Sequence, residues 1–252
     1  MSKVIIANWK ANPSTLAEAQ ELFRAEVANA SNYQNVKTVI CPPFAYLEKL
    51  VKLLNPIPHT LNPVLLGAQD VFWKESEIPE PQKLGISHVL VGHSDRRYPP
   101  AGGGETDDVI NEKIKAALEA GITPVLLVGE RDRSDDRQAI LEKQLLADLA
   151  GLDSSQASRV LIAYEPVWAI STTPGAEADT PENTLEALGI IKDFLTKRYT
   201  LNAIRFLYGG SVTEKNVADF LSHPEVSGAV IGGASLRKDE FANILKIVSE
   251  IE

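Results

Sequence analysis

The sequence contains a single cysteine, Cys41, among its 252 residues. One thiol cannot form a disulfide within the chain, and Cys41 has no Cys-x-x-Cys companion with which to bind zinc. The cysteine content therefore favours a reducing, cytoplasmic location and argues against a structural zinc site. We expect Cys41 to fill space in the core at the end of a strand.

Long hydrophobic runs and an excess of positive charge are also missing. No apolar stretch approaches the ~18 residues that a membrane span needs, and the N-terminus runs directly into a strand pattern without the features of a signal peptide. Lysine and arginine number 25 against 34 aspartate and glutamate residues, which gives a formal net charge of -9. Nucleic acid and membrane are therefore not expected as partners, and any anionic ligand must be bound locally.

Short apolar, β-branched runs recur along the whole chain, separated by segments with helical spacing and capping signals. The predicted strands are Val4–Lys10, Thr38–Pro43, Val64–Asp70, His88–His93, Pro124–Glu130, Val160–Glu165, Arg205–Gly210 and Ala229–Gly233. The predicted helices are Ser14–Ala30, Phe44–Leu54, Glu105–Ala120, Asp135–Leu149, Thr180–Tyr199, Thr213–Leu221 and Asp239–Ile251. Because most of the strands are apolar throughout, they fit a parallel sheet that is covered on both faces.

Eight strand–helix units in an undivided chain predict one α/β domain over residues 1–252. No linker or shift in composition divides the sequence, and its length suits a single (β/α)8 barrel. A doubly wound sheet is the weaker alternative. The clearest helix start is Thr180-Pro181, where a hydroxyl cap precedes a proline at the first helical position.

Three polar clusters follow predicted strands, at Asn8-Trp9-Lys10, Gly92-His93-Ser94-Asp95 and Tyr164-Glu165-Pro166. They supply a cation, an imidazole and a carboxylate at the strand ends, where α/β folds place their chemistry. The run His93-Ser94-Asp95 does not indicate a hydrolase triad, because consecutive residues do not converge on one reacting atom.

Eight motifs, in order over nearly the whole chain, closely resemble those of the triosephosphate isomerase family. They are Asn8-Trp9-Lys10, Cys41-Pro42-Pro43-Phe44, Gly67-Ala68-Gln69, Gly92-His93-Ser94 with Arg96-Arg97, Val128-Gly129-Glu130, Ala163–Ile170, Tyr208–Val212 and Gly232–Leu236. The resemblance implies a TIM barrel and an enzyme of glycolysis and gluconeogenesis. It would interconvert D-glyceraldehyde 3-phosphate and dihydroxyacetone phosphate through an enediolate, without a metal or an organic cofactor.

The resemblance also assigns roles to four side chains. Glu165 is the expected general base, because moving a proton between adjacent carbons needs a carboxylate in a pocket that excludes water. His93 would polarise the substrate carbonyl as a neutral imidazole. Lys10 would stabilise the developing enediolate, and Asn8 would hold Lys10 in place.

Further residues are expected around these four. The substrate phosphate should bind backbone N–H groups, since glycine lets the backbone approach an anion closely. The candidates for this site are Ser171, Gly210, Ser211, Gly232 and Gly233. The resemblance adds Ile170 and Val230 as an apolar clamp over the base, Trp168 and Tyr208 as lid residues, and Asp95 and Glu105 as supports of the site.

Two departures from the family lie in long loops. The segment from Gln69 to Gly85 is shorter than the family's, in which this loop reaches into the neighbouring subunit. A monomer, or an atypical and weak homodimer, is therefore expected. The lid after Ile170 is longer than the family's and lacks its lysine at the far hinge, so we expect a lid that closes with altered hinge geometry.

Two further departures follow His93. Asp95 stands where the family has glutamate, and the loss of about 1.5 Å of reach calls for a bridging water or a shifted Lys10. An insertion with Pro99-Pro100 and three glycines precedes Glu105. With no Lys-Ser/Thr after it, the glycine run indicates a flexible loop and not a P-loop.

Two other functions fit part of the pattern. A non-catalytic phosphoester-binding barrel would keep the pocket but lose effective lid closure, and another phosphosugar isomerase or epimerase would share the fold. The four retained side chains favour the isomerase over the first alternative. The apolar lid residues and the small glycine-lined phosphate site favour a three-carbon substrate over the second.

Overall fold

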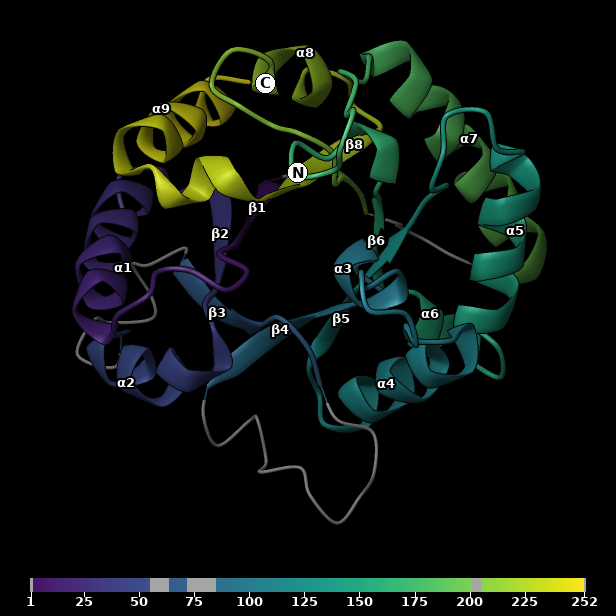
Figure 1. The fold of residues 1–252 in the computed structure, drawn as a ribbon, viewed down its shortest axis with the longest axis horizontal. Coiled ribbons are helices and arrows are strands. Elements are labelled where there is room, and N and C mark those ends of the chain that lie inside the picture. The colour runs from purple at the N-terminus through teal and green to yellow at the C-terminus, as the bar shows by residue number, and fades with distance from the viewer. Residues whose placement is uncertain (1, 55–63, 72–84, 201–204, 252) are drawn as a thin grey trace.

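The computed structural model describes residues 2–54, 64–71, 85–200 and 205–251. Within them, parallel strands pair in sequence order and the last pairs with the first, which closes a barrel. The strands are β1 (Lys3–Asn8), β2 (Val36–Cys41), β3 (Val64–Ala68), β4 (Ile86–Val91), β5 (Thr123–Val128), β6 (Leu161–Tyr164), β7 (Phe206–Tyr208) and β8 (Val226–Ile231). Figure 1 shows the strands as a central ring with the helices outside it. The predicted (β/α)8 barrel is confirmed, and the doubly wound alternative is wrong.

The longer helices lie outside the barrel (Figure 1). The helices are α1 (Leu16–Ala30), α2 (Phe44–Leu54), α3 (Ser94–Arg97), α4 (Asp107–Glu119), α5 (Arg137–Asp148), α6 (Ser154–Ala157), α7 (Pro181–Arg198), α8 (Val217–Leu221) and α9 (Lys238–Ser249), with 3-10 turns η2 (Val167–Ala169) and η3 (Gly233–Leu236). The predicted cap at Thr180 is confirmed, because its side chain accepts a hydrogen bond from the Asn183 N–H. No helix in the described part of the chain is both long and apolar enough to cross a membrane.

Three local predictions differ from the structure. The four-residue helices α3 and α6 were not predicted, since single turns carry no apolar periodicity. The helix predicted from Thr213 begins only at Val217, because the Asn216 side chain accepts a hydrogen bond from the Thr213 N–H at 2.8 Å and forms a turn there.

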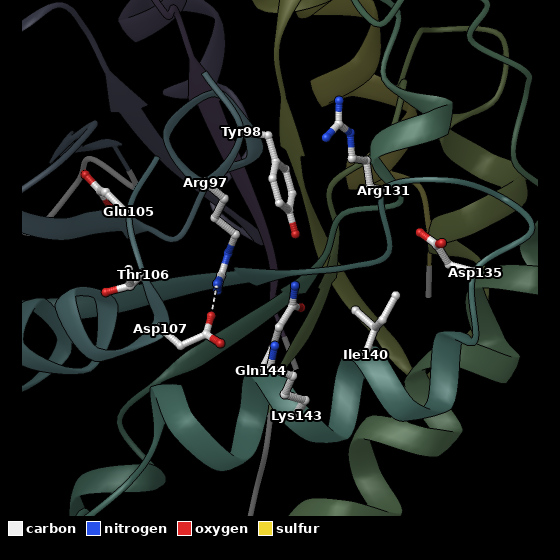
Figure 2. Close-up of a pocket in the computed structure, with 10 residues that line it drawn as sticks. All are labelled: Arg97, Tyr98, Glu105, Thr106, Asp107, Arg131, Asp135, Ile140, Lys143 and Gln144. Carbon is white, nitrogen blue, oxygen red and sulfur yellow. Dashed lines mark hydrogen bonds and ion pairs between the residues drawn. The ribbon is translucent and has the colours of Figure 1, made fainter. Parts of the chain in front are cut away.

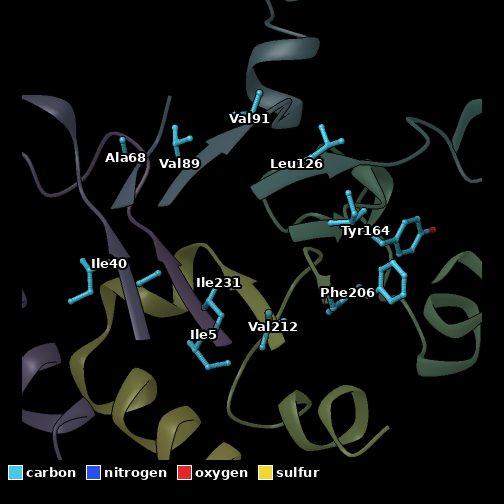
Figure 3. Packing of buried hydrophobic residues seen from close by; sticks show 14 of the residues in the cluster. Ile5, Ile40, Ala68, Val89, Val91, Leu126, Tyr164, Phe206, Val212 and Ile231 are labelled. Atoms are coloured by element: carbon cyan, nitrogen blue, oxygen red, sulfur yellow. The ribbon is translucent and has the colours of Figure 1, made fainter. Parts of the chain in front are cut away.

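The strand side chains alternate between two apolar layers. In β1, Ile5 and Ala7 pack toward the helices, whereas Val4 and Ile6 belong to a separate cluster inside the barrel. Figure 3 shows part of the outer layer, to which strands on all sides of the barrel contribute. Burial on both faces is the reason that the strands appear in the sequence as continuous apolar runs.

Cys41 lies at the end of β2 inside the barrel and is fully buried. Burial raises the pKa of its thiol, with a smaller contribution from Glu26. A buried thiol that stays protonated is unreactive, so Cys41 serves as a core residue.

The shortened segment between Gln69 and Gly85 falls largely on residues 72–84, which lie outside the described residues. The expectation of a monomer or a weak homodimer therefore stays a prediction.

Candidate functional site

A cavity of about 350 Å³ lies at the carboxyl ends of the strands, where residues that follow β1, β4, β6, β7 and β8 meet. Most of the predicted site residues line it, namely Asn8, Lys10, His93, Glu165, Ile170, Ser171, Gly210, Ser211, Val230, Gly232 and Gly233. Asp95, Glu105, Trp168 and Tyr208 are not among its lining residues. The barrel thus brings together residues that are spread over more than 200 positions of the sequence.

Glu165 directly follows β6 and is 3% exposed. Its carboxylate accepts hydrogen bonds from the Ser94 N–H at 2.9 Å and from the Ser94 hydroxyl at 3.2 Å. His93 Nε2 lies 3.2 Å from Glu165 Oε1. Burial raises the pKa of Glu165, although His93, Ser94 and Lys10 oppose the shift. A buried carboxylate of raised pKa at the wall of a cavity is well suited to accept a proton.

His93 follows a turn that only glycine fits, because Gly92 has a φ of 76° and a Cβ there would lie 2.7 Å from the Arg97 guanidinium. His93 Nδ1 accepts a hydrogen bond from the Asp95 N–H at 3.1 Å. This bond requires Nδ1 to be unprotonated, so the ring is neutral and its proton is on Nε2. Nε2–H is the group that the ring presents beside Glu165.

Lys10 has a φ of 51°, which is unusual for a residue other than glycine. Its backbone is held on both sides, since Asn8 Oδ1 accepts from the Lys10 N–H at 3.0 Å and Gln69 Nε2 donates to the Lys10 carbonyl at 2.7 Å. Gln69 also donates to the Cys41 carbonyl at 2.9 Å, so it ties the loop after β1 to the end of β2. The sequence carried a signal for Gln69 in the Gly67-Ala68-Gln69 motif, but no role was predicted for it.

Lys10 Nζ makes a direct ion pair with Asp95 Oδ2 at 3.0 Å. The shorter side chain of Asp95 therefore reaches the lysine without a bridging water, contrary to the first of the two expected consequences of the Glu-to-Asp difference. Asp95 thus places a negative charge next to the ammonium group of Lys10, whose side chain is 24% exposed and lines the cavity.

Trp9, between Asn8 and Lys10, is fully buried and donates from Nε1 to Glu26 Oε1 at 3.0 Å. Glu26 lies on α1 and is 1% exposed, and its Oε2 has no hydrogen-bond partner among the described residues. Burial raises the pKa of Glu26 well above its usual range, and the bond from Trp9 opposes this only partly.

Replacing Glu26 by glutamine is expected to stabilise the protein at neutral and alkaline pH. Because the pKa of Glu26 is raised in the folded state, the protein loses stability as the pH rises from the ordinary carboxyl pKa through the raised pKa. A glutamine does not ionise, so it removes this loss, and its side-chain oxygen can still accept the hydrogen bond from Trp9. We expect Glu26→Gln to raise Tm by a few degrees at pH 8 and by less at pH 5. Calorimetry of this variant beside the exposed Glu119→Gln checks it, and equal gains at both pH values would contradict it.

The first turn of the lid contacts the rim of the barrel at two points. Ser211 Oγ donates to the Ala169 carbonyl at 2.8 Å, and Trp168 Nε1 donates to Glu130 Oε1 at 2.9 Å. Glu130 is 1% exposed and also accepts from the Tyr164 hydroxyl at 2.7 Å. The motif Val128-Gly129-Glu130 was its only signal in the sequence, and its role as the partner of Trp168 was not predicted.

Asp179 anchors the far end of the lid and was also missed. Its carboxylate accepts from the Thr180 N–H at 2.8 Å, from Asn183 Nδ2 at 2.6 Å and from the Thr184 hydroxyl at 2.8 Å. Burial and the nearby Asp179 raise the pKa of Tyr208, whose ring stacks on Phe220 with centroids 4.1 Å apart. Tyr208 ends β7 and does not line the cavity itself.

A second cavity, of about 380 Å³, lies between α4, α5 and the loops after β4 and β5 (Figure 2). Glu105 belongs to its lining and pairs with Arg96 and Lys113, each at 2.6 Å. Arg97, also in its lining, is engaged by Asp107 at 2.7 Å. Glu105 and Arg97 are therefore already engaged in ion pairs with other side chains of the protein, and these ion pairs hold the loop after β4 in place. Glu105 does not line the candidate site, so it can support that site through this loop and through Lys113, which also pairs with Asp70 after β3.

Among the described residues, no three His, Cys, Asp or Glu side chains are grouped so that they could hold a metal ion. What the candidate site offers is a buried carboxylate, a neutral imidazole and an ammonium group around one cavity.

Comparisons with known proteins agree on one family. The family model described as triosephosphate isomerase matches residues 3–248. The triosephosphate isomerase of Dictyoglomus thermophilum is 36% identical, over 97% of this chain and 98% of its own. That of Dehalococcoides mccartyi strain CBDB1 is 37% identical, over 100% of this chain and 99% of its own. The crystal structure of triosephosphate isomerase from Bartonella henselae superimposes with a TM-score of 0.80 at 30% identity, covering 98% of this chain and 99% of that one.

Proposed function

Because the chain belongs to the triosephosphate isomerase family, whose members are aldose–ketose isomerases, we propose that it interconverts D-glyceraldehyde 3-phosphate and dihydroxyacetone phosphate through an enediolate. This is the reaction that links the two triose phosphates in glycolysis and gluconeogenesis. The observation that carries the proposal is the convergence of Glu165, His93 and Lys10 on one cavity.

In the proposed reaction, Glu165 removes a proton from one carbon of the substrate and returns it to the neighbouring carbon. His93 donates its Nε2–H to the carbonyl oxygen of the substrate and takes a proton back from the neighbouring hydroxyl oxygen, so the ring ends the reaction neutral. The Lys10 ammonium group stabilises the negative charge of the enediolate. The electron pair stays within the substrate, and the proton held by Glu165 can exchange with solvent before it is returned, so no oxidant or second substrate is needed.

The contacts of Glu165 imply that the described conformation is a resting one. Its carboxylate is held by the Ser94 N–H and hydroxyl, and it must leave them to reach a substrate carbon. We infer that lid closure, which carries Ile170 toward Val230 over the base, accompanies this move. The phosphate would then bind at Ser171, Ser211 and the backbone of Gly210, Gly232 and Gly233, which line the same cavity.

The test is the conversion of dihydroxyacetone phosphate by the purified protein in D2O, followed by NMR. A carboxylate base exchanges its proton with solvent, so the glyceraldehyde 3-phosphate formed should carry deuterium at C2. Conversion without deuterium that continues at the same rate in Glu165→Gln would overturn the enediolate, because direct hydride transfer needs no carboxylate base. Absence of conversion, with retained binding of the triose, would move the function to the non-catalytic phosphoester-binding barrel.

We predict that lengthening Asp95 will not improve the enzyme. Asp95 already contacts Lys10 at 3.0 Å, and Asp95→Glu would push the lysine by up to about 1.5 Å, so kcat/KM should fall by about tenfold or less. Steady-state kinetics of Asp95→Glu beside the exposed Asp108→Glu on α4 check this. A rise in kcat/KM would mean that the direct contact is not the productive one.

A further inference from the structure

A surface arginine contacts the lid at two points that are nine residues apart. Arg133 lies in the loop between β5 and α5, and its guanidinium Cζ is 5.1 Å from the centroid of the Trp168 ring. The same guanidinium forms an ion pair with Glu177. The lid is defined here as residues 168–179. Arg133 thus contacts both Trp168 in the first turn of the lid and Glu177 near its other end. It does not line the candidate site.

These contacts leave Trp168 held on several sides. Its ring faces Arg133, its Nε1 donates to the buried Glu130 at 2.9 Å, and its carbonyl accepts from the Glu177 N–H at 3.1 Å. Trp168 is three residues after Glu165, so the clamped tryptophan and the proposed base are on one short segment. Holding Trp168 therefore restrains the part of the chain that would have to move with Glu165.

The charges fit a latch that can open. The side chains of Arg133 and Glu177 are 60% and 62% exposed, so the pair is screened by salt and its contribution is modest. The Trp168 ring is buried, but the Arg133 guanidinium over it is exposed to solvent, so this cation–ring contact is also of modest strength. Together, the ion pair and the ring contact can shift the equilibrium between the resting and the closed lid by several-fold and still allow the lid to close.

We propose that Arg133 is a positioning residue that latches the lid in the described resting conformation through Trp168 and Glu177. The proposal rests on the proposed function for its kinetic consequence, but the latch itself is a property of the free protein. It follows that loss of Arg133 makes closure easier. Ligands that need a closed lid then bind more tightly, and KM falls more than kcat changes.

The experiment compares Arg133→Gln with Arg131→Gln as the matched control. Arg131 is in the same loop, but its guanidinium lies over Tyr98, 5.6 Å from the ring centroid, at the second cavity (Figure 2). Glu177→Gln, the double variant Arg133→Gln/Glu177→Gln and Arg133→Lys complete the set. Hydrogen exchange of the amides at 168–177 and Trp168 emission, taken as the difference from Trp168→Phe, report on the lid without any ligand.

We expect Arg133→Gln to speed amide exchange at 168–177 by about three- to tenfold and to change Trp168 emission, while Arg131→Gln does neither. Arg133→Lys should restore part of the protection, and the double variant should match Arg133→Gln. Wild-type protein in 0.5 M KCl should move toward the Arg133→Gln values, because salt screens the ion pair. Identical lid exchange in Arg133→Gln and Arg131→Gln would overturn the latch.

Binding and kinetics then separate the two proposals. Dissociation constants for 2-phosphoglycolate, a small phosphorylated carboxylate, should be about three- to tenfold lower for Arg133→Gln than for Arg131→Gln. Wild-type protein that neither binds this probe nor isomerises triose phosphate would reject the proposed function. The exchange and emission results would still decide the latch in that case.

Discussion

Replacing Glu165 by glutamine is expected to lower kcat for triose phosphate isomerisation by about 10³- to 10⁴-fold, with a much smaller change in KM. The amide has nearly the shape of the carboxylate, and its oxygen can still accept from the Ser94 N–H while its NH2 group donates to the Ser94 hydroxyl, but it cannot accept a proton. The loss therefore belongs to the chemical step and not to the shape of the cavity. Steady-state kinetics in both directions measure it.

The surroundings of Glu165 add a pH dependence to this prediction. Burial raises the pKa of the carboxyl, and the base must be ionised to act, so the wild-type rate should fall as the pH drops through that raised pKa. The exposed Glu119→Gln serves as the control and should keep the wild-type rate and profile. A Glu165→Gln variant with more than a tenth of the wild-type kcat would remove Glu165 from the role of base.

The second large effect is expected on stability, from Arg97→Met. The Arg97 side chain is 5% exposed and contacts Asp148 at 2.6 Å, Asp107 at 2.7 Å and the Gly92 carbonyl at 2.7 Å. Asp148 is fully buried, and burial raises its pKa to about 7 even with Arg97 present. Without the arginine, a buried carboxyl group is left with no cation, so we expect a loss of about 3 to 5 kcal/mol in the free energy of unfolding.

Denaturant unfolding and calorimetry measure this loss, which corresponds to a fall in Tm of roughly 6 to 20 °C for a chain of this size. The loss should be larger at pH 8 than at pH 5, where Asp148 can take up a proton. The double variant Arg97→Met/Asp148→Asn should recover part of the stability, because it removes the buried carboxylate that Arg97→Met leaves unpaired. Arg24→Met, an exposed arginine on α1, is the control, and a loss in Arg97→Met no larger than in this control would show that the buried cluster is not a major source of stability.

Arg97 also connects the stability of the fold to the site. Its guanidinium donates to the carbonyl of Gly92, the residue before His93, so the buried cluster holds the turn that presents the imidazole. The sequence placed Arg97 in a motif next to His93. It did not indicate that the Arg97 side chain points away from the candidate site and toward α4 and α5 (Figure 2).

The sequence was most informative about features that depend on residues close together in the chain. Apolar runs of about four to seven residues located every strand of the barrel, because a strand buried on both faces needs apolar residues at nearly every position. The motifs at the strand ends located Asn8, Lys10, His93 and Glu165, since parallel strands in a closed barrel bring their carboxyl ends to one rim.

The sequence was least informative about residues whose role depends on a distant partner. Glu130, Asp179 and Gln69 act through contacts with the lid or the loop after β1, and no spacing rule connects them with those segments. Asp95 shows the same limit, because the sequence left open a bridging water or a shifted Lys10, and only the structure shows a direct contact between the two side chains.

By itself, then, the sequence determined the strand and helix pattern, the barrel and the set of polar groups at its rim. These depend on periodicity and on residues within a few positions of each other. Tertiary structure alone decided which side chains contact each other across the rim. Arg133 lies over the Trp168 ring and pairs with Glu177, and Lys10 pairs with Asp95. The physical reason is that an ion pair or a ring contact forms over a few ångströms in space, and closure of the barrel brings loops into that range from positions 35 to 85 residues apart in the chain.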